Sequence, residues 1–273
     1  MFIIFGSPRS GTTLLASSLD QNDQLVVLDE SDFIIPMAFI LDRVKNERVG
    51  RRLIAEVIAQ TQRFPDTLGR FLQQTEIAGI LAEVEYTLSA MLQALYERVA
   101  FKAGKHSAGD KPPNDIGFAR MLIKNGLVHS PIKVVHIVRD VHDVLMSLAE
   151  VQPHDLPELA IFPRWWAQSN LLLQDMYSAN PHRYLFIQYE DLVLNPIVEF
   201  RRVTNFLGVS FQEAMLDGAA RSSRHQGNPR HRNLGLPICQ RRGNWRDTMP
   251  VELQARCLVQ AREALERFGY PLQ

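Results

Sequence analysis

The amino-acid sequence predicts an α/β fold in which a central parallel sheet is covered by helices. Short apolar segments with the length of buried strands alternate with segments of helical period. A glycine-rich segment joins the first of these strands to the first helix. A long stretch from about residue 37 to 104 is mostly helical in period and predicts a helical insertion over the sheet. With 273 residues, 46% of them hydrophobic, we expect one domain, residues 1–273, with a substantial core.

The individual elements follow from apolar patterns and their end signals. Phe2–Phe5 is an apolar run that leads directly into the glycine-rich segment, and the helix Thr12–Leu19 follows it. Further strands are predicted at Leu25–Leu28, Val134–Val138 and Tyr184–Ile187. Near the end of the chain, an amphipathic helix begins after Pro250 and covers Val251–Arg267, before Gly269. Strands that alternate with helices in this way form parallel sheets with right-handed crossovers.

The composition argues against several classes of protein. The chain has 30 basic and 30 acidic residues, so a broad nucleic-acid-binding face is not expected. No apolar run approaches the roughly 20 residues that span a bilayer, and Met1–Phe5 is too short for the apolar region of a signal peptide. Only Cys239 and Cys257 could form a disulfide, and the sequence has no C-x-x-C pair, so we expect a cytoplasmic location.

One segment concentrates positive charge. Seven of the 30 basic residues are arginines between Arg221 and Arg246, where the chain has no acidic residue. Glycine, proline and asparagine residues in this segment predict a loop. Charge alone does not distinguish a solvated loop from one that binds an anion. The zero net charge is therefore a cancellation between this segment and an acidic remainder, and it is compatible with a small anionic ligand.

The segment Gly6-Ser-Pro-Arg-Ser-Gly-Thr-Thr13 predicts an anion-binding loop. It follows a strand and opens a helix, so its N–H groups can converge on one phosphate-sized anion. Gly6 and Gly11 keep the spacing of a nucleoside triphosphate P-loop, but Thr12 stands where that loop has its lysine. Arg9 lies inside the loop instead. This arrangement favours a single 5′-phosphate with a further anionic group beside Arg9; an ordinary strand-to-helix turn is the structural alternative.

The segment Gly6–Leu15 resembles the 5′-phosphosulfate loop of the sulfotransferases that use 3′-phosphoadenosine 5′-phosphosulfate (PAPS). It is most similar to the branch that contains the tyrosylprotein sulfotransferases and many bacterial enzymes. The resemblance implies a P-loop-like three-layer sulfotransferase fold, with PAPS as co-substrate and 3′,5′-adenosine bisphosphate as product. It also implies that several loop residues bind the nucleotide, namely Arg9, Ser10, Gly11, Thr12 and Thr13.

A second segment, Lys133–Ser147, resembles the family's 3′-phosphate segment of strand, Arg-Asp turn and helix. Arg139 and Ser147 fall at the family's spacing, which implies that both bind the nucleotide. An arginine at the carboxyl end of a strand and a hydroxyl on the next helix can reach one phosphate at that edge of the sheet. Val141 departs from the family, which usually has proline there. Taken alone, both residues are also compatible with ordinary structural roles.

Two further segments resemble the family. The segment Gln188–Pro196 is similar to the motif after the last strand, which implies that Tyr189 lies against the nucleotide; core packing is the alternative. Arg241-Arg-Gly-Asn-Trp245 is similar to the terminal loop that closes on the 3′-phosphate, which implies binding roles for Arg242 and Gly243. The resemblance covers most of residues 1–36 and 105–273.

The catalytic residues are expected among charged side chains near the loop. Sulfuryl transfer needs cations at the bridging oxygen, and the resemblance assigns this role to Arg9 and to Lys111 in Gly109-Asp-Lys-Pro-Pro113. The acceptor hydroxyl needs a general base, and the resemblance implies Glu30, which lies about as far beyond Arg9 as the catalytic glutamate of the tyrosylprotein branch. The alternatives are Asp29, Asp32 and His106, and the acids could instead cap a helix. His136, inside a predicted strand, is expected to be a core residue.

The sequence thus predicts an O-sulfotransferase that moves a sulfuryl group from PAPS to a hydroxyl of a carbohydrate, tyrosyl, lipid or other small acceptor. No metal is expected, because neither the cysteines nor the histidines have metal-ligand spacing. We expect the insertion 37–104 and a loop around Trp165 and Trp166 to shape the acceptor site. The alternatives are a P-loop kinase or hydrolase acting on ATP, and an inert nucleotide-binding or carrier-docking module. The oligomeric state is left open.

Overall fold

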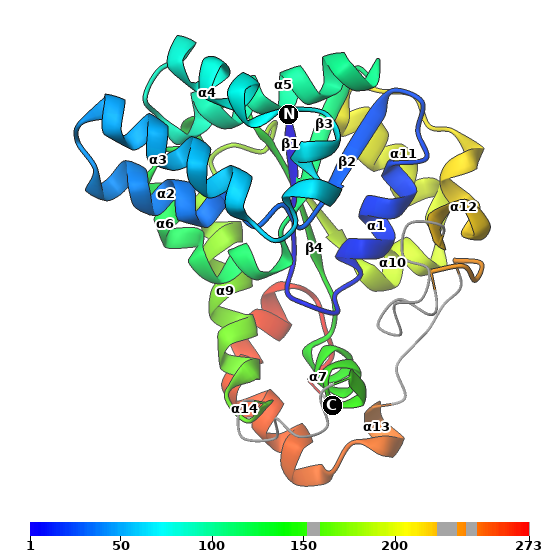
Figure 1. Ribbon diagram of the computed structural model, residues 1–273. Helices are drawn as coiled ribbons and strands as arrows, with labels where there is room; N and C mark the ends of the chain where they lie inside the picture. Colours follow the sequence, from blue (N-terminus) through cyan, green and yellow to red (C-terminus); the bar gives the residue numbers. More distant parts are fainter. Residues whose placement is uncertain (152–158, 223–233, 239–244, 273) are drawn as a thin grey trace.

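A five-stranded parallel sheet forms the centre of the computed structural model of the protein, which describes residues 1–151, 159–222, 234–238 and 245–272. The strand order is β2-β3-β1-β4-β5, and every ladder is parallel. All five carboxyl ends therefore lie at one edge of the sheet (Figure 1). The strands are β1 (Phe2–Phe5), β2 (Leu25–Asp29), β3 (Ser107–Lys111), β4 (Lys133–Val138) and β5 (Tyr184–Gln188).

Helices connect the strands and cover both faces of the sheet. The α-helices are α1 (Thr12–Leu19), α2 (Ile34–Arg43), α3 (Glu47–Gln60), α4 (Gln74–Glu83), α5 (Leu88–Ala103), α6 (Ala119–Lys124), α7 (Val141–Val151), α9 (Phe162–Tyr177), α10 (Tyr189–Leu194), α11 (Pro196–Leu207), α12 (Gly218–Ser222), α13 (Trp245–Thr248) and α14 (Val251–Arg267). Short 3₁₀ helices are η1 (Phe64–Asp66), η2 (Leu68–Arg70), η3 (Pro113–Phe118), η4 (Leu127–His129) and η5 (Glu213–Leu216). Within the described part of the chain, no helix has the length and apolar character needed to cross a membrane.

The period-2 alternation of β1 divides the core into two layers. Ile3 and Phe5 pack with α2 to α5 and α9, whereas Phe2 and Ile4 pack with α1, α10 and α11. Figure 1 shows α2 to α5 on one side of the sheet and α1 with α11 on the other. A third apolar cluster joins α7, α9 and α14 near the carboxyl edge of the sheet. The predicted three-layer α/β architecture is confirmed.

The strand β3 was not predicted, and its sequence explains why. Ser107-Ala-Gly-Asp-Lys111 contains none of the β-branched or aromatic residues that favour strands. It forms a strand because it lies between β1 and β2 and pairs with both. Gly109 is required there, since a Cβ atom at this position would lie 2.3 Å from the ring of Phe2. The other four strands lie where the sequence predicts them.

The predicted helical insertion is present, because residues 37–104 contain helices and 3₁₀ turns and no strand. The ends of α5, the last helix of the insertion, are capped by local contacts. The Thr87 side chain accepts a hydrogen bond from the Ala90 N–H at its start, and Gly104, at φ 66°, ends it. The expected loop around Trp165 and Trp166 is wrong, since both residues lie in the first turns of α9. Trp166 is fully buried and Trp165 is half-buried.

Candidate functional site

The loop from Gly6 to Gly11 links β1 to α1 through two close contacts that demand glycine. A Cβ atom on Gly6 would lie 2.5 Å from the carbonyl oxygen of Ile137, and one on Gly11 would lie 2.4 Å from the ring of Tyr189. Gly11 has φ +92° and forms the N-cap of α1, so it offers no side chain to the first turn of that helix. The N-terminal N–H groups of α1 therefore face the loop, as in anion-binding sites.

Four of the predicted nucleotide-binding side chains meet beside this loop. The Arg9 Nε atom donates a hydrogen bond to Ser147 Oγ on α7 at 3.0 Å. Arg139, just beyond the end of β4, donates from NH1 to the Arg9 carbonyl oxygen at 3.2 Å, and its guanidinium lies 4.6 Å from the centroid of the Tyr189 ring. Residues from β4, α7 and α10 thus converge on the loop, although they are up to about 180 positions apart in the sequence.

The surroundings of Arg139 fit an anionic ligand. Its Nε atom is buried and has no hydrogen-bond partner among the described residues. A buried guanidinium N–H without a partner is costly, and a phosphate or sulfate oxygen is its best acceptor. Arg9 itself is held in the left-handed region at φ 69°, which is unusual for a residue with a side chain. This strained loop and the unsatisfied arginine both point to a bound anion at this place.

Lys111, at the end of β3, is fully buried and connects the loop to the end of β2. Its Nζ atom lies 2.7 Å from Glu30 Oε1, 2.5 Å from Asp29 Oδ1 and 3.2 Å from Thr13 Oγ1. The register of the sheet makes this possible, since Asp29 and Lys111 are direct partners across β2 and β3. A buried ammonium is tolerated only where charges and acceptors surround it, as they do here.

Arg63 also approaches the two carboxylates, and sequence reasoning missed it. Its NH2 atom lies 3.5 Å from Asp29 Oδ2 and 3.9 Å from Glu30 Oε2. Arg63 precedes η1 in the helical insertion, far from any motif, so only the packing of the insertion on the sheet brings it here. The insertion therefore supplies a side chain to the candidate site.

Several carboxyl groups close to this site have raised pKa values. Burial raises the pKa of Asp115 to about 8, with further contributions from the negative charges of Asp110 and Asp32. Burial also raises the pKa of Asp110 to about 6, against hydrogen bonds that stabilise its charged form. The pKa of Asp32 is raised by burial and by the charge of Glu30. The site therefore combines buried cations with carboxyls that hold protons more tightly than usual.

The two histidines that the sequence singles out lie elsewhere. His106 is exposed at the amino end of β3, where its N–H donates to the Gln24 carbonyl oxygen. A strand rises by roughly 3.3 Å per residue, so His106 at the amino end of β3 lies far from Lys111 at its carboxyl end. This separation argues against His106 as the base. His136 is buried between Tyr184 and Asn170, which lie 2.6 and 2.8 Å from its ring nitrogens. Burial lowers its pKa to about 4, as expected of a core histidine.

Of the seven arginines in the segment from Arg221 to Arg246, the structure describes only Arg221 and Arg246. Arg221 is fully buried and donates to the carbonyl oxygens of Leu236 and Met215, at 2.9 and 3.3 Å. Its guanidinium therefore holds the chain together, and it is buried rather than placed in a solvated or anion-binding loop. The predicted binding residues Arg242 and Gly243 lie outside the described residues.

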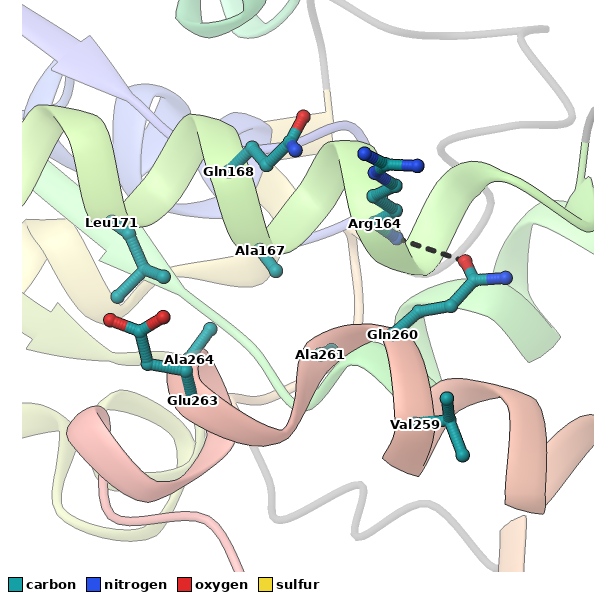
Figure 2. A pocket seen from close by; sticks show the side chains of 9 residues that line it. All are labelled: Arg164, Ala167, Gln168, Leu171, Val259, Gln260, Ala261, Glu263 and Ala264. Atoms are coloured by element: carbon teal, nitrogen blue, oxygen red, sulfur yellow. Dashed lines mark hydrogen bonds between the residues drawn. The ribbon is translucent and has the colours of Figure 1, made fainter.

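A separate pocket of about 380 Å³ lies between α9 and α14 (Figure 2). Its wall includes a hydrogen bond from the Arg164 N–H to Gln260 Oε1 at 3.3 Å. The lining residues are Arg164, Ala167, Gln168, Leu171, Val259, Gln260, Ala261, Glu263 and Ala264. None of them belongs to the cluster around Arg9 and Lys111, so this pocket is a groove between two helices and not the candidate site. Among the described residues, no three His, Cys, Asp or Glu side chains gather as metal ligands would.

Comparisons with known proteins agree with this geometry. The family model described as "Sulfotransferase family" matches residues 2–213. Mouse carbohydrate sulfotransferase 4 is 28% identical over 145 residues, which are 50% of this chain and 36% of that protein. Chicken protein-tyrosine sulfotransferase 2 is 24% identical over 223 residues, which are 79% of this chain and 53% of that protein. The chain thus spans only a third to about half of the length of these relatives.

A solved structure supports the fold. The sulfotransferase domain of the Synechococcus PCC 7002 olefin synthase superposes with a TM-score of 0.63 at 23% sequence identity, over 100% of this chain and 95% of that domain. The match covers the sheet, the insertion and the C-terminal helices together. The predicted fold class is therefore confirmed by an independent structure.

Proposed function

The chain belongs to the sulfotransferase family, whose model matches residues 2–213, and from this premise we propose that it transfers a sulfuryl group from PAPS to a hydroxyl group of an acceptor. The observation that carries the proposal is the contact of Lys111 Nζ with both Glu30 Oε1 and Thr13 Oγ1, at 2.7 and 3.2 Å. This contact joins a cation and a candidate base to the first turn of the helix that opens the anion-binding loop.

The nucleotide would be held by the residues that converge on this loop. The N–H groups and hydroxyls of Ser10, Thr12 and Thr13 suit a 5′-phosphate at the start of α1. Arg139, Ser147 and Tyr189 suit the other end of the nucleotide. The buried Arg139 Nε, which has no hydrogen-bond partner in the described part of the chain, supports this assignment. PAPS supplies the activated sulfuryl group, and Arg9 is the loop cation beside it. The binding roles of Arg242 and Gly243 stay predictions from the resemblance.

The residues would divide the chemistry as follows. A new bond forms between the acceptor oxygen and sulfur while the bond from sulfur to the bridging phosphate oxygen breaks. Lys111 and Arg9 neutralise the charge that develops on the bridging oxygen, as fixed cations do in phosphoryl transfer. Glu30 accepts the proton of the acceptor hydroxyl, and its position against Lys111 puts proton acceptance next to charge neutralisation. Asp29 and Asp32 are the alternative bases.

Titration with 3′,5′-adenosine bisphosphate and with ATP tests the proposal. A sulfotransferase should bind the bisphosphate more tightly, because Thr12 stands where a triphosphate site has its lysine. Tighter ATP binding with Mg²⁺-dependent turnover would instead identify a kinase or hydrolase. An inert module would bind the bisphosphate and yield no sulfated product with any acceptor.

Labelled PAPS added to a lysate of the source organism would reveal the acceptor.

We also propose that the acceptor approaches Glu30 from the side of the helical insertion. Glu30 lies just before α2, and Lys111 lies just before η3, so both elements border the site. Each carries an exposed aromatic ring, Phe39 on α2 and Phe118 on η3, which meet edge to face at 6.5 Å between centroids. Exposed rings of this kind pack against sugar or aromatic groups.

A cytoplasmic location is likewise a proposal, based on the low cysteine content, and fractionation of the source cells tests it.

Replacement of Phe118 tests this acceptor side. Phe118→Ala should raise the KM for the acceptor about tenfold by removing apolar contact area, and leave the bisphosphate Kd unchanged. Phe101→Ala is the matched control, because Phe101 is also exposed but lies near the end of α5, away from the carboxyl edge of the sheet. Equal effects of the two substitutions would contradict the proposed direction of approach.

A further inference from the structure

A buried carboxylate lies directly behind the candidate base. Asp110 is fully buried, and its carboxylate accepts hydrogen bonds from Tyr96, Ser31 and Lys111. Tyr96 OH donates to its Oδ2 atom at 2.6 Å, the Ser31 hydroxyl donates to the same oxygen, and the N–H of Lys111 donates to Oδ1 at 2.8 Å. The hydroxyl oxygens of Tyr96 and Ser31 are themselves 3.3 Å apart. We refer to Tyr96, Asp110 and Ser31 as the Asp110 network.

The position of Asp110 is unfavourable for a charged side chain. Its neighbours across the sheet are Ile3 on β1 and Leu28 on β2, both buried in the apolar cluster under the insertion. A buried charge of this kind adds little to stability, and apolar residues of similar size often replace it without loss. The network is therefore better explained by what it holds in place than by a contribution to the core.

The network holds a strained turn. Glu30 and Asp32 both adopt φ 58°, in the left-handed region that residues with side chains rarely enter. Such strain persists only where surrounding contacts fix the backbone, and it concentrates at functional sites. Ser31 lies between the two strained residues, and its buried hydroxyl is bound by Asp110.

The alternation of β3 links this turn to the candidate site. Successive side chains of a strand point to opposite faces, so Asp110 and Lys111 leave the end of β3 in opposite directions. Lys111 binds the Glu30 carboxylate, while Asp110 binds the hydroxyl of Ser31 next to it. Resting on the sulfuryl transfer proposed above, we propose that the Asp110 network is a positioning device that keeps the Glu30 carboxylate against Lys111 for proton transfer.

Removal of one hydroxyl at a time tests the network. Ser31→Ala and Tyr96→Phe should each lower kcat about tenfold or more, because small displacements of a catalytic group are costly. The bisphosphate Kd should stay within about twofold, because the residues assigned to the nucleotide meet at the loop after β1, whereas the network joins β3, α5 and the turn after β2. Ser18→Ala and Tyr177→Phe are matched controls: both hydroxyls are buried and have no hydrogen-bond partner among the described residues. Neither control should change kcat.

A double-substitution cycle separates positioning from general damage. If Ser31 acts through Glu30, then Ser31→Ala should cause no further loss of kcat in a Glu30→Gln background. Losses that multiply in the double variant would mean that Ser31 acts independently of Glu30, and would overturn the proposal. Equal losses in Tyr96→Phe and Tyr177→Phe would do the same.

Crystal structures of the parent and of Ser31→Ala provide a test that needs no acceptor. Glu30 and Asp32 should leave the left-handed region in Ser31→Ala, and the contact between Glu30 and Lys111 should lengthen beyond about 4 Å, the limit of an ion pair. Ser18→Ala should keep the turn unchanged. An unchanged turn in Ser31→Ala overturns the network proposal whatever the activity. A parent chain that forms no sulfated product would overturn the proposed function, while these structures would still decide the role of the network.

Discussion

Lys111 carries its charge in a place where water cannot reach it. Its ammonium is neutralised by Asp29 and Glu30 and touches Thr13, so one side chain joins the end of the sheet to the start of α1. A buried cation with fixed partners is oriented in advance, which is the condition under which it best stabilises developing negative charge. Arg139 has the same character on the other side of the loop, where its Nε atom is buried and unpartnered among the described residues.

Lys111→Ala should lower turnover by a factor on the order of 10² or more, since it removes a cation that acts mainly in the transition state. The variant should also unfold at a lower temperature, because Asp29 would lose a buried partner. Steady-state kinetics with labelled PAPS and thermal unfolding check the two effects. Lys105→Ala is a suitable control, because Lys105 lies at the amino edge of the sheet, where its Nζ atom donates to the Asn22 carbonyl oxygen. Unchanged turnover in Lys111→Ala would remove this residue from the mechanism.

Arg139→Ala should mainly weaken nucleotide binding. Loss of a charge-assisted contact to a phosphate should raise the Kd for 3′,5′-adenosine bisphosphate about 10- to 100-fold, with a smaller effect on turnover at saturation. Isothermal titration calorimetry measures this Kd directly. Arg183→Ala serves as the control, since Arg183 lies before β5 at the opposite edge and donates to the His129 carbonyl oxygen. An unchanged Kd would show that Arg139 does not contact the ligand.

At the scale of elements, the strand-loop-helix unit β1-loop-α1 depends on how closely its neighbours approach. Tyr189 on α10 packs against Gly11, and the end of β4 packs against Gly6. These contacts hold the loop beside Arg139 and Tyr189, so that the N–H groups at the start of α1 and the arginines lie close together. The loop is therefore shaped by α10 and β4 as much as by its own glycines.

Gly11→Ala should damage both the loop and the fold. The new Cβ would lie 2.4 Å from the Tyr189 ring at a φ of +92°, so we expect a loss of about 1–2 kcal/mol from the backbone alone and weak binding of the bisphosphate. Gly79→Ala is the opposite case, because Gly79 lies inside α4 with open space around it. That substitution should raise stability by about 0.5–1 kcal/mol. Urea unfolding of both variants gives the comparison, and a neutral Gly11→Ala would contradict the described loop.

The whole molecule brings carboxyl groups together that the sequence keeps apart. Asp32 follows β2 and is exposed, Asp110 lies in β3 and is fully buried, and Asp115 lies in η3 and is half-buried. Their raised pKa values make stability depend on pH. A carboxyl whose folded pKa lies above its unfolded value favours the folded state below the unfolded pKa, and this advantage disappears as pH rises through the folded pKa.

For Asp115, whose pKa is about 8 in the folded chain against 3.8 ordinarily, the relevant window runs from about pH 4 to 8. Asp115→Asn cannot ionise, so the stability of the variant relative to the parent should increase as pH rises from 5 to 8. We expect an increase of at least about 1.4 kcal/mol, the value of one pKa unit. Urea unfolding at several pH values measures it. A constant difference would show that Asp115 is not buried as described.

Local sequence patterns determined much of the site. The glycine spacing, Arg9, Arg139, Ser147 and Tyr189 were all expected near one loop, and the structure brings them together. The resemblance implied the roles of Arg139, Ser147 and Tyr189, and geometry agrees with it because parallel strands place their carboxyl ends at one edge of the sheet. Helix ends and the four apolar strands were readable from the sequence, since their signals lie within a few residues.

Only the tertiary structure decided the rest, because the decisive contacts join distant segments. β3 has weak strand preference and exists because β1 and β2 pair with it. Arg63 reaches the candidate base through the packing of the insertion, and Arg221, which sequence suggests for a ligand, is instead buried against Leu236. The Asp110 network joins β3, α5 and the turn after β2. The sequence by itself thus determined the glycine-rich loop and its arginines, whereas folding decided how Glu30, the proposed base, is held.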